Sequence, residues 1–188
     1  DHDPLTNLPN RRQLFQRLNE MLDAAGTSTR EGSHIAVLFL DLDNFKTVND
    51  TLGHDFGDRV LTEIGERLRL IAGDGGFIAR LGGDEFTLVF PYSGDPAEVQ
   101  QRAERLVGGF QRPLLIDRRE VSVGVSCGVA MYPEHGRDAT SLLRAADVAL
   151  FRAKELGRNR LCVHDPAMLV QASNRFRVEQ ALRKAIDG

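Results

Sequence analysis

The chain has 188 residues, of which 41% are hydrophobic, so it is long enough for one domain with an apolar core that needs no disulfide or metal for stability. Its formal net charge of −3 argues against a protein that coats nucleic acid, because such proteins carry a strongly basic surface. The sequence contains no run of about 18 apolar residues, so it predicts no membrane-spanning helix. Its two cysteines lack metal-ligand spacing, which is typical of a reducing, cytoplasmic setting. We therefore expect neither nucleic-acid binding nor membrane contact from these residues.

Apolar periodicity predicts the first half of the fold. Asn10 is a suitable N-cap for a helix, because apolar residues follow it at helical spacing. The continuous apolar run 35–40 predicts a strand that is buried on both faces. Helical spacing resumes at Phe45 and again over residues 58–70.

Two strand pairs are predicted in the second half. Strands at 77–81 and 86–90 flank Gly82-Gly83, which predicts a hairpin with a type I′ turn. Paired strands among helices indicate an α/β (α+β) sandwich with a mixed, mainly antiparallel central sheet, and not a doubly wound parallel sheet. The remaining predicted elements are a helix at 95–110, a second strand pair at 114–116 and 121–132, a helix at 139–155 and a short strand at 161–163.

Two aspartates, Asp41 and Asp43, end the apolar strand, where alternate residues share one face. Carboxylates this close repel each other, which raises a pKa unless a cation neutralises them. Mg²⁺ suits such a pair, because it takes oxygen ligands and shares them with substrate phosphates; Mn²⁺ is the alternative ion. A second interpretation is that Asp43 or Asn44 only caps the next helix. The two interpretations are compatible, since the amides at a helix N-terminus favour phosphate.

Two further polar clusters carry little information when each is taken alone. The acidic pair Asp84-Glu85 follows the two glycines of the predicted hairpin and could simply flank a turn. Lys154 and Arg158 lie one turn apart near the end of a predicted helix, where cations interact favourably with the helix dipole even without a ligand.

All of these blocks occur together and in order, and the chain resembles the GGDEF family of nucleotide cyclases over nearly its whole length. By this resemblance residues 1–165 form the GGDEF domain and residues 166–188 a C-terminal helical linker. The matching blocks are Asp3-x-Leu5-Thr6-x-Leu8-x-Asn10-Arg11, Asp41-Leu42-Asp43-x-Phe45-Lys46-x-x-Asn49-Asp50, Gly82-Gly83-Asp84-Glu85-Phe86, Ala146-Asp147-x-Ala149-Leu150-x-x-Ala153-Lys154 and Gly157-Arg158-Asn159.

The resemblance implies a fold similar to the palm of polymerases and adenylyl cyclases. It also implies an activity, the magnesium-dependent condensation of two GTP molecules into cyclic di-GMP with release of two pyrophosphates. Each domain supplies half of a site, so two domains must face each other with two-fold symmetry, and the expected partner is a transient homodimer.

The family pattern also implies a role for each matching residue. The metal is held by the carboxylates of Asp41 and Asp84 and by the backbone carbonyl of Leu42. The proton acceptor is Asp84 or Glu85, and the sequence does not choose between them. Lys46 stabilises charge in the transition state.

The family pattern implies that a second group of residues binds GTP. The guanine edge is contacted by Asn49 and Asp58, and an ionised Asp58 accepts from guanine's N–H groups but mismatches adenine. The other implied substrate contacts are the amides near Asn44 and Phe45, the glycines Gly82 and Gly83, and the cations Lys46, Lys154 and Arg158.

One departure from the family pattern concerns product inhibition. Many relatives carry an inhibitory product site, Arg-x-x-Asp, shortly before the signature. The corresponding positions here are Gly73 and Gly76. We therefore expect no strong inhibition by cyclic di-GMP through this site.

The C-terminal stretch 174–187 has the spacing of an amphipathic helix and resembles the lead-in to an EAL phosphodiesterase domain. This predicts a longer protein with an adjacent EAL domain and an upstream sensor, which could be anchored in a membrane.

Three alternative functions compete with the cyclase. A catalytically quiet GTP-binding domain could regulate the EAL neighbour, although the motif residues are intact. A cyclase that makes an adenine-containing dinucleotide is disfavoured by Asp58. A pure interaction module leaves Asp41, Asp84 and Lys46 without a purpose.

Overall fold

A five-stranded sheet forms the centre of the computed structural model, which describes residues 1–28 and 33–168. The strand order is β2-β3-β1-β6-β7, and all neighbours are antiparallel except the parallel pair β6 and β7. The predicted mixed, mainly antiparallel sheet is therefore confirmed. The strands are β1 (His34–Leu42), β2 (Phe77–Gly82), β3 (Glu85–Tyr92), β6 (Val125–Tyr132) and β7 (Leu161–Val163).

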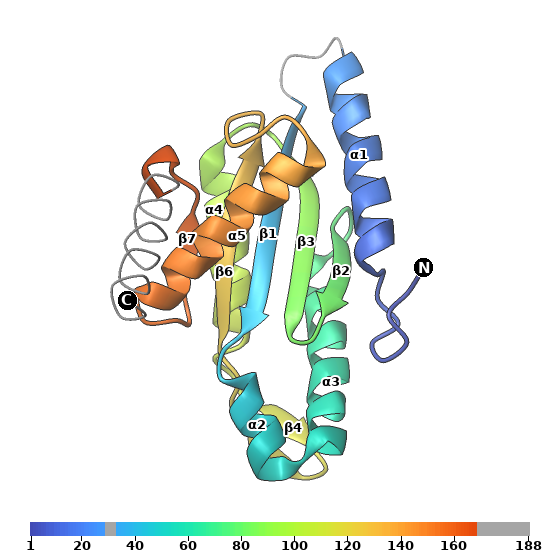
Figure 1. Cartoon of the computed structure of the whole chain (residues 1–188), viewed down its shortest axis with the longest axis vertical. Coiled ribbons are helices and arrows are strands. Elements are labelled where there is room, and N and C mark those ends of the chain that lie inside the picture. Colours follow the sequence, from blue (N-terminus) through green and yellow to red (C-terminus); the bar gives the residue numbers. More distant parts are fainter. Residues whose placement is uncertain (29–32, 169–188) are drawn as a thin grey trace, which may run out of the picture.

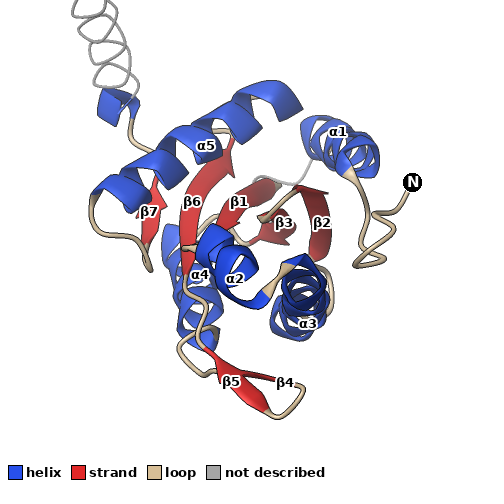
Figure 2. Cartoon of the chain, turned by 60° about the horizontal axis from the view of Figure 1, so that its bottom comes forward, coloured by secondary structure: helices blue, strands red, loops and turns tan. Residues whose placement is uncertain are grey.

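Helices cover both faces of this sheet (Figures 1 and 2). Ile64 of α3 and Leu106 of α4 belong to the core on one face, and Leu18 of α1 and Leu142 of α5 belong to the core on the other. The result is the predicted sandwich of helices around a sheet. The helices are α1 (Arg11–Thr27), α2 (Phe45–Leu52), α3 (His54–Ala72), α4 (Pro96–Gly109) and α5 (Ala139–Glu155).

The central strand β1 explains the continuous apolar run in the sequence. It lies between β3 and β6, and its residues from Ile35 to Leu42 are all buried. Successive side chains of a strand point to opposite faces, so Val37 enters one core and Leu38 the other. The prediction of a strand buried on both faces is confirmed.

Local signals place the helix ends. The Asn10 side chain accepts a hydrogen bond from the amide of Gln13 at 3.1 Å, so the predicted N-cap is confirmed. The second predicted helix, 58–70, begins earlier, at His54, because only Gly53 separates α2 from α3. Gly53 adopts a φ of 89°, which reverses the chain between the two helices and favours glycine.

The second predicted hairpin is wrong in part. β4 (Leu114–Ile116) pairs with a short strand, β5 (Arg119–Val121), and not with the long strand that follows. That long strand is β6, which enters the central sheet beside β1. The apolar alternation that begins at Val121 continues into β6 without interruption, so the sequence pattern hides this break.

The first hairpin exists, but its turn is not type I′. Gly82 pairs with Glu85, so the tip residues are Gly83 and Asp84, and the pairing shifts register between Arg80 and Gly82. Gly82 and Gly83 have φ values of 138° and 53°, whereas Asp84 has no positive φ. The glycine pair therefore builds an irregular, bulged end to β2 and not the two central positions of the turn.

Most of the predicted linker, 166–188, and all of the predicted amphipathic helix at 174–187 lie outside the described residues. No helix in the described part of the chain is long and apolar enough to cross a membrane.

Candidate functional site

The acidic end of β1 lies directly beside the hairpin that joins β2 and β3. The antiparallel register places Asp41 opposite Glu85 on one side and opposite Ser126 of β6 on the other. The amide of Leu42 donates to the carbonyl oxygen of Asp84 at 3.2 Å. Two acidic segments that are more than 40 positions apart in the sequence are thus adjacent at one edge of the sheet.

Asp41 is a buried carboxylate, 9% exposed, that pairs with one cation. Nζ of Lys154, at the end of α5, lies 2.9 Å from its Oδ2. Burial raises the pKa of Asp41, the charges of Asp84 and Asp43 raise it further, and Lys154 offsets only part of the effect. A further cation next to Asp41 would therefore favour the ionised carboxylate.

Glu85 belongs to the same acidic cluster. Burial raises the pKa of Glu85, and the neighbouring charges of Asp41, Asp147 and Asp84 raise it as well. Asp147 lies on the exposed side of α5, so this helix contributes both an acid and Lys154 to the cluster. Four carboxylates around a single lysine leave net negative charge, which a divalent cation can neutralise.

The donor chemistry at this point fits Mg²⁺. Asp41 and Asp84 have carboxylate oxygens, and Leu42, the last residue of β1, has a backbone carbonyl. Within residues 1–28 and 33–168, no cluster of three or more His, Cys, Asp or Glu side chains has the geometry to hold a metal alone. A set with two carboxylates suits an ion that completes its shell with water and phosphate oxygens.

Asp43 contacts other residues than Asp41 does. Its Oδ1 accepts a hydrogen bond from Oγ of Ser126 at 2.6 Å, and its Oδ2 accepts from the amide of Asn159 at 2.8 Å. Asn44 occupies the N-cap position of α2 with a φ of 59° and makes no side-chain capping bond. The capping interpretation is therefore wrong for both residues.

A hollow of about 560 Å³ opens next to this network. The start of α2 forms one wall, and the loop after α5 forms the other, with Arg158 on it. Lys46 is exposed on α2 and does not line the hollow, and Lys154 contacts Asp41. The lining residues are Asp43, Asn44, Thr47, Val48, Ser122, Gly124, Gly157, Arg158 and Asn159.

Asn49 of α2 packs tightly against Gly57 of α3, the residue before Asp58. A Cβ atom on Gly57 of α3 would come within 1.8 Å of Oδ1 of Asn49 and within 3.3 Å of the Phe45 ring. The absence of a side chain at Gly57 therefore gives the Asn49 side chain its place against α3, and Asp58, the next residue of that helix, is exposed. Gly57 was not recognised from the sequence, although a glycine inside a helical pattern is a signal of close packing.

Arg80 is a second residue that sequence reasoning missed. It is 8% exposed, and its Nη1 lies 2.9 Å from both carboxylate oxygens of Asp3. Its Nε and Nη2 donate to the carbonyl oxygen of Gly83 at 3.1 and 2.7 Å. One guanidinium thus ties the N-terminal turn to the tip of the acidic hairpin.

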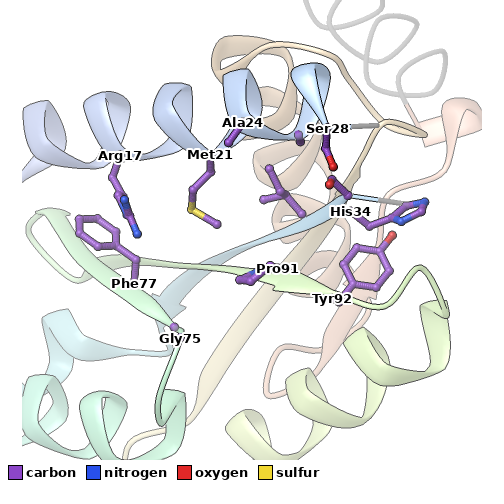
Figure 3. Close-up of a pocket in the computed structure, with 13 residues that line it drawn as sticks. Arg17, Met21, Ala24, Ser28, His34, Gly75, Phe77, Pro91 and Tyr92 are labelled. Carbon is purple, nitrogen blue, oxygen red and sulfur yellow. The ribbon is translucent and has the colours of Figure 1, made fainter. Parts of the chain in front are cut away.

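The positions that would carry an inhibitory site lie in the turn between α3 and β2. Gly73 and Gly75 have φ values of 60° and 84°. Gly75 and Gly76 border a hollow of about 700 Å³ between α1 and the strand edge, where Arg17 and Tyr92 are also found (Figure 3). No Arg or Asp side chain stands at the two expected positions.

The central sheet, the helices on both of its faces and the paired acidic segments agree with what the comparisons with known proteins show. The family model "Diguanylate cyclase, GGDEF domain" matches residues 1–160. The chain belongs to the GGDEF family.

Two of the relatives with assigned activities come from Pseudomonas aeruginosa. The "Bifunctional diguanylate cyclase/cyclic di-GMP phosphodiesterase MucR" is 41% identical over 186 residues, 99% of this chain and 27% of MucR. The "Cyclic di-GMP phosphodiesterase NbdA" is 35% identical over 98% of this chain and 23% of its own length. The chain thus spans about a quarter of these two relatives.

A third relative is known as a structure. "Diguanylate cyclase TpbB" of P. aeruginosa is 39% identical over 172 residues, 89% of this chain and 39% of TpbB. A solved structure of its GGDEF domain alone superposes with a TM-score of 0.86 at 35% identity and covers 92% of this chain and 99% of that chain. The chain therefore has the fold of solved GGDEF domains.

Proposed function

We propose that this domain condenses two GTP molecules into cyclic di-GMP and releases two pyrophosphates. The observation that carries the proposal is the acidic site in which Asp41 at the end of β1 lies beside Asp84 and Glu85 of the hairpin, with Lys154 at 2.9 Å from Asp41. Such a site can hold a divalent cation next to a triphosphate.

Asp41, Asp84 and the carbonyl of Leu42 would hold Mg²⁺, or Mn²⁺ in its place. When bound, the ion would activate the ribose 3′-hydroxyl and neutralise charge that develops on the phosphates. The hydroxyl of one GTP attacks the α-phosphorus of the other, and its proton goes to Asp84 or Glu85. Both carboxylates stay candidates, because they lie side by side at the hairpin tip.

The remaining residues bind and orient GTP. Lys46, Lys154 and Arg158 would contact phosphate oxygens, together with the amides near Asn44 and Phe45 at the start of α2. Asn49 and Asp58 would bind the guanine edge. Gly82 and Gly83 have open space where a Cβ atom would stand, which would let the substrate approach the backbone closely.

Each domain presents one such half-site, so the proposal requires two copies that face each other during turnover. The proposal of further domains in the same protein is supported by the names and lengths of the relatives. MucR is named as both a cyclase and a phosphodiesterase, and this chain spans only 27% of it. We propose that an adjacent EAL domain and an upstream sensor accompany the domain in a longer protein.

A second candidate function is a GTP-binding domain that regulates a neighbouring phosphodiesterase without making product. It is favoured by the similarity to NbdA, which is named only as a phosphodiesterase. The intact Asp41, Asp84 and Lys46 favour the cyclase instead.

Product analysis from equimolar GTP and ATP with Mg²⁺ tests the proposed function. Mass spectrometry is expected to find cyclic di-GMP alone, because Asp58 accepts from guanine N–H groups and cannot pair with the adenine edge in the same way. An adenine-containing cyclic dinucleotide would contradict the base assignment. GTP binding without pyrophosphate release would favour the regulatory function.

Gly57→Ala is expected to weaken GTP binding about tenfold without destabilising α3. The new Cβ would collide with Oδ1 of Asn49, at 1.8 Å, and displace one guanine contact, whose loss is worth about 1.5 kcal/mol. The matched control is Gly65→Ala on the same helix, where the Cβ would meet Leu8 and Thr6 at an ordinary 3.4 Å. Calorimetric titration with GTP checks both variants; equal affinities would contradict the prediction.

Cyclic di-GMP added at the start of the reaction is expected to leave the initial rate unchanged. Gly73 and Gly76 carry no side chain that could bind a phosphate or a base. Restoring both groups, Gly73→Arg with Gly76→Asp, is the comparison variant, although φ of Gly73 is 60° and disfavours a side chain there. Strong inhibition of the unmodified chain, with contacts at 73–76, would contradict the prediction.

A further inference from the structure

Asp43 has no role in the proposed chemistry, yet it is the most connected acid of the site. It is 9% exposed. Its amide donates to the carbonyl oxygen of Gly124 at 2.8 Å, and its two carboxylate oxygens accept from Ser126 and Asn159. Two segments, 124–126 and the loop at Asn159, thus meet at Asp43, and none of these contacts reaches a proposed metal ligand.

The loop that Asp43 contacts has an unusual backbone. Arg158 and Asn159 adopt φ values of 63° and 47°, which side-chain-bearing residues rarely do. Such conformations cost free energy and persist only where the surroundings hold them. The bond from the Asn159 amide to Oδ2 of Asp43, at 2.8 Å, joins this loop to the end of β1.

Gly124 packs closely against the hydrogen bond between Asp43 and Asn159. A Cβ atom on Gly124 would lie 3.1 Å from Oδ2 of Asp43 and 3.3 Å from Oδ1 of Asn159. On the far side, the amide of Cys127 in β6 donates to the carbonyl of Arg160 at 2.9 Å. The loop is therefore held at the two residues that directly follow Arg158, and Arg158 lines the hollow at the start of α2.

We propose that Asp43 is a positioning residue that holds residues 157–159 in their left-handed conformation and so presents Arg158 to the phosphates of GTP. The inference rests on the proposed function in one respect, the assignment of Arg158 as a phosphate contact. The carboxylate acts here as a double hydrogen-bond acceptor and not as a metal ligand or a proton acceptor.

Two substitutions separate these roles. Asp43→Asn keeps the shape: its Oδ1 can accept from the Asn159 amide, and its Nδ2 can donate to Oγ of Ser126. Asp43→Ala removes both bonds. A positioning role predicts near-normal GTP affinity for Asp43→Asn and roughly tenfold weaker binding for Asp43→Ala. A role that depends on the negative charge would make the two variants equally defective, which would overturn the proposal.

The dependence on Arg158 is tested by a double-mutant cycle. Arg158→Ala is expected to weaken GTP binding by itself, and to add little in the Asp43→Ala background, because the loop has already lost its position. Full additivity of the two changes would show that Asp43 does not act through Arg158.

Amide hydrogen exchange tests whether Asp43 holds the loop through the Asn159 amide, and this measurement needs neither a variant nor turnover. The Asn159 amide is expected to be as protected as that of Cys127, which is bonded in the sheet. Fast exchange of Asn159 alone would overturn the proposal, even if Asp43→Ala fails to fold. Protection together with weakened GTP binding in Asp43→Ala would support it even if the chain makes no cyclic di-GMP, so the two proposals can fail separately.

Discussion

Asp84→Ala is expected to reduce cyclic di-GMP formation by at least about a thousandfold, which corresponds to roughly 4 kcal/mol of lost transition-state stabilisation. The substitution removes one of the two carboxylates that would hold Mg²⁺, and a candidate proton acceptor with it. It leaves the hairpin glycines in place, and the carbonyl of residue 84 can still accept from the Leu42 amide. Product formation is measured at saturating GTP and Mg²⁺.

The matched control is Asp74→Ala, which removes an exposed aspartate from the turn between α3 and β2. It is expected to keep full activity. Unfolding curves of both variants must match that of the unmodified chain, so that lost activity reports on chemistry. If Asp84→Ala retained most of its activity, the carboxylate of Asp84 would have neither of the roles assigned to it.

Arg80→Met is expected to lower the free energy of unfolding by about 3–5 kcal/mol. The guanidinium is 8% exposed, and it satisfies the carboxylate of Asp3 and the carbonyl of Gly83 at once. Methionine fills similar volume but leaves both acceptors without that partner. Urea denaturation measures the change.

The control is Arg119→Met on the exposed strand β5, which is expected to change stability by less than about 0.5 kcal/mol. Asp3→Asn combined with Arg80→Met should cost little more than Arg80→Met alone, because both remove the same ion pair. A small effect of Arg80→Met would mean that water replaces the guanidinium without cost.

The ion pair of Asp3 also predicts a pH dependence. Burial tends to raise the pKa of Asp3, but hydrogen bonds from Thr6 and the charge of Arg80 outweigh it and hold the pKa below its ordinary value of 3.8. A depressed pKa contributes stability above the unfolded-state value and loses it as pH falls through the folded-state value. The stability difference between the unmodified chain and Asp3→Asn should thus shrink below pH 3.8 and stay constant above about pH 5. A difference that did not change with pH would contradict the assignment.

Local patterns were sufficient where one segment determines its own structure. The apolar run that became β1 could only be a strand buried on both faces, and α5 was predicted with its observed bounds, 139–155. The order of the strands was harder to predict from the sequence, because β6 cannot be told from a continuation of β5 until its pairing with β1 is known. The pairing of β1 with β6 is a contact between distant residues, and the bond from the Asp43 amide to the carbonyl of Gly124 continues it by one residue.

The candidate site also combines features that the local sequence predicts with features that depend on contacts between distant residues. Asp41, Asp84 and Lys154 stand in recognisable blocks, and the structure brings them together. The contacts that hold these blocks are between distant residues: Arg80 with Asp3, 77 positions apart, and Asp43 with Asn159, 116 positions apart. No local pattern predicts such pairs, since the partners are neighbours only after the sheet has formed.

The proposed cyclase is tested most directly by incubating the chain with GTP and Mg²⁺ over a range of protein concentrations and identifying the product by mass. Two half-sites must meet for each turnover, so the rate of cyclic di-GMP formation is expected to rise with about the square of the protein concentration while dimers are rare. GTP binding without pyrophosphate release at every concentration would contradict the cyclase and support a regulatory domain.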